Sequence, residues 1–335
     1  MKLAQVMAGA PQGGAELFFE RLTLALHDAG DDVLAAVRRD PQRAARLKAG
    51  GVVPLELGFG GVFDLLTGPR LKRALRDFSP TVTVAWMNRA ARFTPAGPWT
   101  LVGRLGGYYD LKYYRRCDHL VGNTHDLVRY IVAQGWPADR AHYLPNFAPD
   151  LVGAAPAALP GQRRLLALGR LHRNKGFDVL IRALASVPAA HLSLAGEGPE
   201  RDALTRLAAE CGVADRVTFL GWRQDTGALL AGADLLVVPS RHEPLGNVVL
   251  EGFSAGRPVI AAAAAGPREL IEDGRNGILV PLEDPGALAV AIAALLAESD
   301  RASALAAAGR QTFAQNFAEA PVVAAWRAFL AQVAP

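Results

Sequence analysis

The amino-acid sequence predicts an α/β protein with two doubly wound, Rossmann-like parallel sheets. Short apolar runs alternate with amphipathic helical stretches along the chain, which is typical of parallel sheets with helices on both faces. The 335 residues are sufficient for two domains of about 150 residues each. The alternation stops in residues 143–162, where four prolines indicate a linker, and then starts again. The sequence therefore predicts one sheet on each side of this linker.

The first series begins with an apolar strand at residues 2–8. A helix follows at residues 15–30, because its apolar residues recur at helical spacing before a glycine stop. Further strands are expected at residues 33–39, 52–57, 81–86, 100–105 and 119–123. The second series has strands at residues 164–171, 191–198, 217–221, 234–240, 258–264 and 277–280, and helices at residues 177–187, 198–212, 226–233 and 246–256.

Composition indicates a globular protein of a reducing compartment. Hydrophobic residues make up 51% of the chain and charged residues 20%. Cys117 and Cys211 are the only cysteines, which argues against a disulfide framework. No apolar run reaches the roughly 18 residues that cross a bilayer, and residues 1–10 read as a strand rather than a signal peptide. These observations predict a cytoplasmic protein.

Positive charge is concentrated in the first half of the sequence. Residues 1–150 hold 19 Lys and Arg against 14 Asp and Glu, and the remainder holds 17 against 18. A basic half fits an anionic membrane surface, an acidic acceptor or nucleic acid, and it equally fits an ordinary arginine-rich surface. The sequence lacks RNA-binding aromatic runs, zinc-ligand spacing and a lysine tail, so we expect no nucleic-acid partner.

Four junctions between strands and helices carry candidate binding residues. In residues 9–16, Gly13 and Gly14 would let the backbone approach an anion at a helix start, although such a turn is more often only a turn. The motif matches neither G-x-G-x-x-G nor the Walker sequence, which argues against dinucleotide and P-loop sites. In residues 169–176, Arg170 and Lys175 could bind a diphosphate, or lie in an ordinary solvated loop. Residues 195–199 form a further glycine turn.

The fourth junction, residues 240–251, places two glutamates near one loop. Glu243 lies in the loop, and Glu251 follows about one turn into the next helix. Gly246 has no Cβ to block a ligand, and two carboxylates would accept hydrogen bonds from a sugar and a ribose. The helix dipole alone would explain Glu251. It does not explain Glu243, Gly246 and the basic loop together.

This stretch, EPLGNVVLE, resembles the Glu-x7-Glu motif of retaining GT-B glycosyltransferases of family 4, which use nucleotide sugars. The resemblance extends over the chain through QGGAE, GRLHRNKG, LAGEGP, VTFLGW, ADLLVVPS and DGRNGILV. It implies two Rossmann-like domains that face each other across a cleft. Residues 1–148 would form the acceptor side and residues 149–315 the donor side, and a terminal helix, 316–335, would pack back on the first domain.

The resemblance also implies residue roles. Arg170 and Lys175 would hold the donor diphosphate, Glu243 would bind the hexose hydroxyls, and Glu251 would bind the ribose. Further donor contacts would come from Gly13, Gly14, Gly169, Leu245, Gly246, Asn247, Val248 and Trp222. The implied reaction is front-face transfer of a hexose, with retention, from a UDP-sugar or similar donor to a glycan, lipopolysaccharide or lipid-linked acceptor. No metal and no cofactor beyond the co-substrate is implied, and the sequence contains no Asp-x-Asp.

One position departs from the family pattern. Many relatives carry a histidine after a first-domain strand, where this chain has Arg89. Arg89 could serve a phosphate or an acidic acceptor, or lie on the surface with Asn88 as the working group. Asp110 is a second acceptor-side candidate. The altered histidine leaves a non-catalytic nucleotide-sugar sensor or partner subunit as the alternative function, whereas an epimerase would lack Glu-x7-Glu.

The acceptor side offers two further indications. Tyr108-Tyr109 and Tyr113-Tyr114 resemble exposed aromatic pairs, which with the basic half suggest peripheral contact with the inner face of an anionic membrane. Core packing is the commoner fate of tyrosine. Phe317, Val322, Trp326 and Leu330 recur at helical spacing near the end of the chain, which predicts the apolar face of the terminal helix.

Overall fold

The chain forms two α/β units. The computed structural model describes residues 1–10, 13–60 and 64–335. Unit 1 comprises Met1–Phe147 and Glu319–Pro335, and unit 2 comprises Ala148–Ala318. The sequence placed the first boundary after residue 148 rather than after Phe147, and the second after residue 315 rather than after Ala318.

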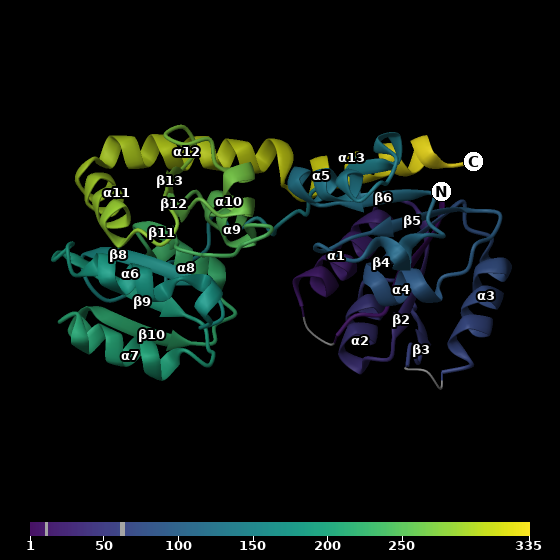
Figure 1. Cartoon of the computed structure of the whole chain (residues 1–335), viewed down its shortest axis with the longest axis horizontal. Helices are drawn as coiled ribbons and strands as arrows, with labels where there is room; N and C mark the ends of the chain where they lie inside the picture. The colour runs from purple at the N-terminus through teal and green to yellow at the C-terminus, as the bar shows by residue number, and fades with distance from the viewer. Residues whose placement is uncertain (11–12, 61–63) are drawn as a thin grey trace. The chain divides into compact units, whose positions relative to one another are not determined.

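A sheet of seven parallel strands forms the centre of unit 1 (Figure 1), in the order β3-β2-β1-β4-β5-β6-β7. The strands are β1 (Lys2–Met7), β2 (Asp32–Arg38), β3 (Leu55–Leu57), β4 (Val82–Trp86), β5 (Thr100–Arg104), β6 (His119–Gly122) and β7 (Ala141–Tyr143). Because β2 and β3 lie on one side of β1 and β4 on the other, the strand order reverses between β1 and β4. This pair runs in register from Leu3 and Val82 to Met7 and Trp86.

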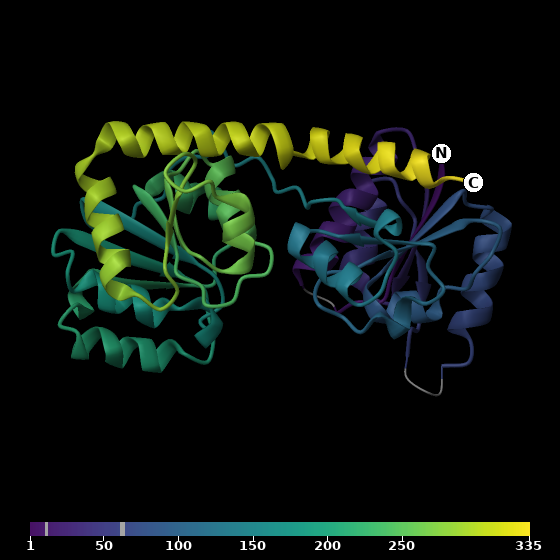
Figure 2. The ribbon, with the colours of Figure 1, turned by 45° about the horizontal axis from the view of Figure 1, so that its top comes forward.

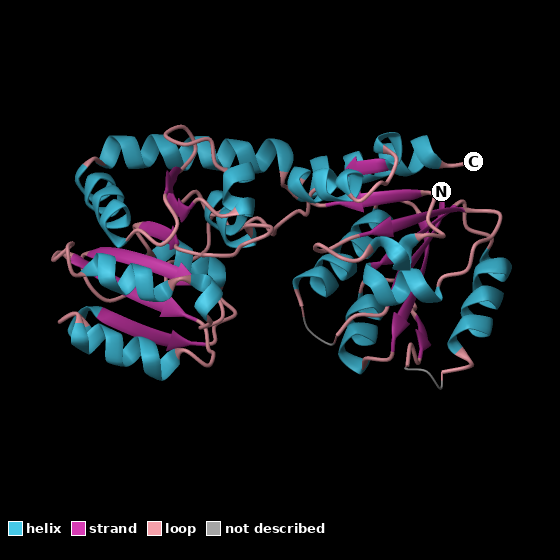
Figure 3. Cartoon of the chain, viewed as in Figure 1, coloured by secondary structure: helices cyan, strands magenta, loops and turns pink. Residues whose placement is uncertain are grey.

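Helices cover both faces of this sheet (Figure 3). One core contains Phe19 of α1, Leu47 of α2 and Trp326 of α13. The other contains Leu71 of α3, with side chains from α4 and α5. The helices are α1 (Gly14–Asp28), α2 (Pro41–Ala49), α3 (Thr67–Phe78), α4 (Met87–Phe93), α5 (His125–Ala133) and α13 (Glu319–Val333), with short 3-10 helices at Leu111–Tyr114 and Ala138–Arg140.

The terminal helix α13 packs on unit 1, as Figure 2 shows for the yellow end of the chain. Val322, Trp326 and Leu330 are buried in the core that contains α1, and the Trp326 ring stacks on Trp86 with 6.3 Å between ring centroids. Phe317 does not share this face. It follows the end of α12 and lies in a core of unit 2, so its grouping with the other three residues was wrong.

Unit 2 is built on a sheet of six parallel strands in the order β10-β9-β8-β11-β12-β13. The strands are β8 (Arg163–Leu168), β9 (Ala190–Ala195), β10 (Val217–Gly221), β11 (Leu235–Val238), β12 (Val259–Ala262) and β13 (Ile278–Val280). The order reverses between β8 and β11, which pair at Leu165 and Leu235. All paired strands in both units are parallel among the residues that the structure describes, as the alternating sequence predicted.

The helices of unit 2 also form two layers. Leu184 of α6, Leu207 of α7 and Ile292 of α11 pack in one core, and Phe253 of α9 packs with Phe313 of α12 in the other. The helices are α6 (Phe177–Leu184), α7 (Arg201–Glu210), α8 (Thr226–Gly232), α9 (Asn247–Ser254), α10 (Ala265–Leu270), α11 (Pro285–Ala297) and α12 (Ser299–Asn316), with 3-10 helices at Arg173–Lys175 and Ala214–Arg216. The predicted fold class, two doubly wound Rossmann-like units, is confirmed. None of the described helices is long and apolar enough to cross a membrane.

Candidate functional site

The strand order of unit 2 brings two of the predicted junctions together. In open parallel sheets, ligands bind beyond the carboxyl ends of the strands where the order reverses. In unit 2 the strands at this point are β8 and β11. Residues 169–176 follow β8 and contain Arg170 and Lys175, and residues 239–246 follow β11 and contain Glu243. Lys175 and Glu243 are 68 residues apart in the sequence, but their two loops form one site.

Backbone contacts fix these two loops against each other. Gly176 has φ +65°, and a Cβ at this position would lie 2.0 Å from the carbonyl oxygen of Pro239. The backbone N–H groups of Arg241 and His242 donate to the carbonyl oxygen of Asn174 at 2.8 and 3.2 Å. These contacts require glycine at residue 176 and leave little freedom in the relative position of the loops.

The central contact of the site joins the side chains of Lys175 and Glu243. Lys175 Nζ lies 2.5 Å from Glu243 Oε2, and the two side chains are 24% and 9% exposed. The second carboxylate oxygen, Oε1, lies 3.4 Å from the backbone nitrogen of Gly246. The resemblance assigns Lys175 to the diphosphate and Glu243 to the sugar. The structure adds that the two groups neutralise each other in a largely buried position.

The loop after Glu243 is supported by the chain segment after β12. Gly266 donates its backbone N–H to the carbonyl oxygen of Glu243 at 2.7 Å. A Cβ on Gly266 would lie 2.6 Å from the backbone nitrogen of Gly246. Gly246 itself has φ +74° and directly precedes α9. The predicted amide donors therefore lie at and before the first turn of α9, at Leu245, Gly246, Asn247 and Val248, with Glu251 further along the same helix.

The remaining donor-side residues lie at the same end of this sheet. Gly169 and Arg170 follow β8, and Arg170 is exposed with no ion-pair partner in the described part of the chain. Trp222 follows β10 and is 70% exposed, although large aromatic side chains are usually buried. Arg223, beside it, binds Asp225 through two contacts of 2.8 and 2.5 Å. The exposed indole is thus available to stack on a flat ligand.

In unit 1, a hollow of about 270 Å³ lies where the strand order reverses, between β1 and β4. Its walls include both alternatives for the altered histidine position, Asn88 and Arg89. Asn88 Oδ1 is buried and has no hydrogen-bond partner among the described residues, and Arg89 is exposed. Met87, which begins α4 here, has φ +61°. Such strain in a non-glycine residue costs about 1–3 kcal/mol and is concentrated at functional sites.

A carboxylate occupies the glycine loop between β1 and α1. The Oε1 atom of Glu16 accepts the backbone N–H of Ala10 at 2.9 Å. A Cβ on Gly9 or Gly13 would lie 2.3 or 2.2 Å from the Glu16 carboxylate oxygens. These glycines therefore make room for a carboxylate of the chain itself. Anion contact by Gly13 and Gly14 stays a prediction, and Pro11 and Gln12, which belong to the same motif, lie outside the described residues.

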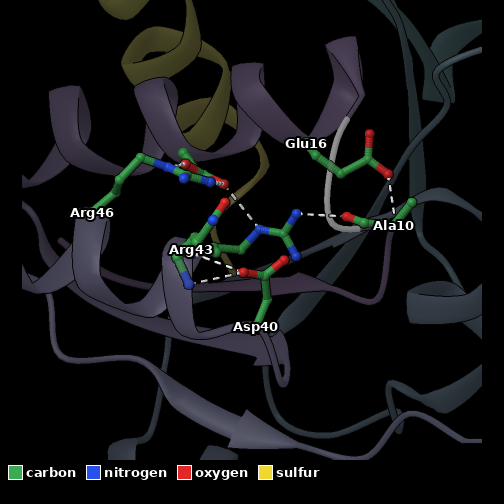
Figure 4. A network of polar contacts seen from close by, with 7 residues as sticks. Ala10, Glu16, Asp40, Arg43 and Arg46 are labelled. Carbon is green, nitrogen blue, oxygen red and sulfur yellow. Dashed lines mark hydrogen bonds and ion pairs between the residues drawn. The ribbon is translucent and has the colours of Figure 1, made fainter.

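Arg43 of α2 is hydrogen-bonded to this loop (Figure 4). Arg43 is fully buried; its Nη2 donates to the carbonyl oxygen of Ala10 at 2.7 Å, and its Nε donates to Glu20 at 3.0 Å. Arg46 also binds Glu20, at 2.6 and 2.9 Å, and this hydrogen bond raises the pKa of Arg46. The loop conformation is thus connected to α2 through Arg43.

Sequence reasoning missed Arg104, a buried cation at the end of β5. Its side chain is 1% exposed and lies against the rings of Phe18 and Trp86, 5.5 and 4.9 Å from their centroids. Nη2 donates to Asn146 Oδ1 at 2.6 Å, while Nε and Nη1 have no partner in the described part of the chain. Burial lowers the pKa of Arg104 to about 10. The position of this arginine inside the apolar run of residues 100–105 could have indicated a buried cation.

The structure gives Asp110 a local structural role. Its carboxylate accepts the backbone N–H of Lys112 at 2.9 Å and pairs with Lys112 Nζ at 2.6 Å. The hydrogen bond to Lys112 lowers the pKa of Asp110. Tyr114, expected as half of an exposed aromatic pair, is fully buried, so that expectation was wrong for this residue. Tyr108 is exposed.

Residues 1–10, 13–60 and 64–335 contain no cluster of three or more His, Cys, Asp or Glu side chains that could hold a metal ion.

Comparison with known proteins gives relatives that match nearly the whole chain. The family described as glycosyl transferases group 1 matches residues 162–298. Lipopolysaccharide core biosynthesis glycosyltransferase LpsD of Rhizobium meliloti (strain 1021) is 35% identical over 97% of this chain and 97% of its own length. LpsE of the same organism is 34% identical over 95% of this chain and 96% of its own length.

Among solved structures, Anabaena HepE in complex with UDP aligns with a TM-score of 0.86 at 21% identity, over 99% of this chain and 100% of that chain. At this identity the likeness concerns the fold, and it matches the two Rossmann-like units described above. With relatives of more than 30% identity along nearly its whole length, the chain belongs to the group 1 glycosyltransferases and has the GT-B fold.

Proposed function

We propose that this glycosyltransferase moves a hexose from a UDP-sugar to a glycan of the lipopolysaccharide type or to a lipid-linked acceptor, with retention of anomeric configuration. The contact between Lys175 and Glu243, at the reversal point of unit 2, carries this proposal. The names of LpsD and LpsE support the acceptor class, and the UDP bound to HepE supports the nucleotide.

The donor diphosphate would bind beside β8. Its charge would be met by Arg170, which has no carboxylate partner among the described residues, and by Lys175, which would exchange Glu243 for a phosphate oxygen. Cations at this position act mainly on turnover, because negative charge on the diphosphate increases as the sugar leaves. Before the donor binds, the ion pair with Glu243 holds the Lys175 ammonium in place for this exchange.

The sugar and the nucleoside would bind on opposite sides of the diphosphate. The Glu243 carboxylate would accept hydrogen bonds from hexose hydroxyls, with backbone amides at Gly246 and Asn247 beside it. Glu251 in α9 would accept the ribose hydroxyls. The exposed ring of Trp222 would stack on the base.

The transfer balances without a side-chain base. The bond between the anomeric carbon and the phosphate oxygen breaks, and a bond to the acceptor oxygen forms on the same face of the sugar. The departing phosphate oxygen takes the acceptor proton. We propose that no metal or other cofactor takes part, on the absence of Asp-x-Asp from the sequence. A cytoplasmic location at the inner face of the membrane is proposed from the two cysteines and the basic first half.

Transfer assays with UDP-hexoses and a deacylated lipopolysaccharide core, followed by NMR of the new anomeric centre, test this function. We expect transfer with the donor's anomeric configuration and slow donor hydrolysis when acceptor is omitted. Arg170→Ala and Lys175→Ala should each lower kcat. If each residue acts like an oxyanion-hole donor, its loss should raise the activation free energy of transfer by about 2.7–4 kcal/mol. UDP-sugar binding with neither transfer nor hydrolysis would instead indicate a sensor or partner subunit.

A further inference from the structure

Unit 1 contains a set of arginines whose side chains form no ion pair with a carboxylate in the part of the chain that the structure describes. Two hollows, of about 490 and 430 Å³, adjoin each other across α4 and share Arg92. The first is lined in part by Arg38, Arg89 and Arg92, and the second by Arg92, Lys112, Arg115 and Arg116. We call Arg38, Arg89, Arg92, Arg115 and Arg116 the arginine group.

No side chain of the arginine group has a hydrogen-bond or ion-pair partner in residues 1–10, 13–60 and 64–335. The other five residues of the chain, 11, 12 and 61–63, carry no carboxyl group in the sequence. The acids nearby are used elsewhere. Asp110 pairs with Lys112, and Asp64 lines the first hollow but binds Thr67 Oγ1 at 2.6 Å and the backbone N–H of Gly60 at 2.7 Å.

The arginine group also continues into the hollow at the reversal of the strand order. Arg38 and Arg89 line both the hollow of about 490 Å³ and the one that contains Asn88. Asp64 lines the hollow of about 490 Å³ and Glu16 lines the one at Asn88, but both carboxylates are hydrogen-bonded to other groups. The like charges of the arginines therefore repel one another, and an anionic ligand would reduce this repulsion. Arginine binds phosphate and carboxylate groups through two parallel hydrogen bonds, which favours it over lysine at such sites.

We propose that the arginine group binds phosphate or carboxylate groups of an anionic saccharide acceptor and directs its neutral end toward the hollow at Asn88. That the ligand is an acceptor rests on the proposed glycosyltransferase function. That the arginine group binds anions rests on the geometry of unit 1 alone. A concave site is favoured over a flat membrane contact, because the arginines line hollows and because Tyr113 lies among them.

Direct binding to the purified full chain tests this proposal without any transfer reaction. Glucose, glucose 6-phosphate and glucuronate would be titrated by calorimetry or NMR, and the two anionic probes distinguish phosphate from carboxylate. The test variant is Arg92→Gln with Arg116→Gln. The control, Arg73→Gln with Arg76→Gln, makes the same charge change on the exposed surface of α3, outside both hollows.

We expect one or both anionic sugars to bind, and glucose to bind at least tenfold more weakly. The test variant should lose at least tenfold in affinity, and the control should match the unchanged chain. UDP affinity should be the same in all three proteins, and melting curves verify folding. Equal binding of glucose, binding of neither anionic sugar, or equal effects of the two double variants would overturn the proposal. Binding to phosphatidylglycerol vesicles but to neither anionic sugar would also overturn the proposal. If the test variant lost this vesicle binding, the arginine group would be a membrane contact.

Discussion

The ion pair between Lys175 and Glu243 should affect both the stability of the fold and the binding of the donor. At 2.5 Å between charged atoms, the gross attraction is about 7 kcal/mol with an effective dielectric constant of about 20. Desolvation of two largely buried groups offsets most of this attraction. We therefore expect a coupling free energy of about 1–3 kcal/mol in a double-mutant cycle of Lys175→Met and Glu243→Gln.

The stability arm of the cycle is measured by calorimetry. In a unit of this size each kcal/mol shifts Tm by about 2–4 °C, so the coupling is well above the error of the method. Glu243→Gln keeps an oxygen near Gly246, and Lys175→Met keeps the apolar stem, so both changes remove charge with little loss of packing. Arg223→Gln and Asp225→Asn form the matched control. That pair is more exposed, and we expect no measurable coupling there.

The binding arm separates the two roles. Lys175→Met should weaken UDP binding by about 10- to 100-fold, because a hydrogen bond to a charged group contributes about 1.5–3 kcal/mol. Glu243→Gln should leave UDP binding unchanged or tighter, because Lys175 no longer has to leave a carboxylate. Equal weakening of UDP binding by the two single variants, or a coupling free energy of zero, would refute the reasoning.

Three further predictions concern other parts of the chain. UDP should quench fluorescence from the exposed Trp222, and Trp222→Phe should abolish the quenching; quenching that persists would place the base elsewhere. Arg89→Ala should lose most of the transfer rate while Arg89→His retains part of it, both with unchanged melting temperature; full activity of Arg89→Ala would make Asn88 the working group. Burial lowers the pKa of His119 and, together with nearby His119, that of His142. The native state therefore binds fewer protons than the unfolded chain, so stability should fall as pH falls below about 6.5, and His119→Gln should flatten the pH dependence of Tm.

The sequence predicted the strand positions well because apolar runs mark buried parallel strands. The strand expected at residues 81–86 is β4 (Val82–Trp86), and the strand expected at 234–240 is β11 (Leu235–Val238). The helix expected at residues 246–256 is α9 (Asn247–Ser254). Several helices were not predicted. α2 is one of these, although Asp40 caps it at 3.0 Å from two backbone nitrogens and Pro41 begins it. Its single buried face, with Arg43 in it, gives a weak apolar signal.

Side-chain pairing was harder to predict than position. Motif spacing placed Lys175 and Glu243 in separate loops, but only the order of the strands shows that β8 and β11 are neighbours. The role of Glu16 was hidden for a similar reason. A glycine-rich turn predicts open space beside the backbone for a ligand, but here the carboxylate of Glu16, three residues after Gly13, fills that space. Contacts that depend on rotamers and on long-range topology leave no periodic trace in the sequence.

The two units differ in how they use positive charge, and this difference bears on ligand choice. At the strand ends of unit 2, Lys175, Arg223 and Arg241 each have a carboxylate partner, whereas Arg170 has none among the described residues. A diphosphate that binds Lys175 must therefore match an interaction already present, which penalises weak or misplaced anions. The arginine group of unit 1 has no such competitor among the described residues, so an anionic group binds there without displacing an acid. We infer that unit 2 selects its anion partly by exchange at Lys175, whereas unit 1 attracts anions by net charge. Raising the salt concentration should accordingly weaken anion binding by unit 1 more than donor binding by unit 2, because exposed charges are screened more than buried ones.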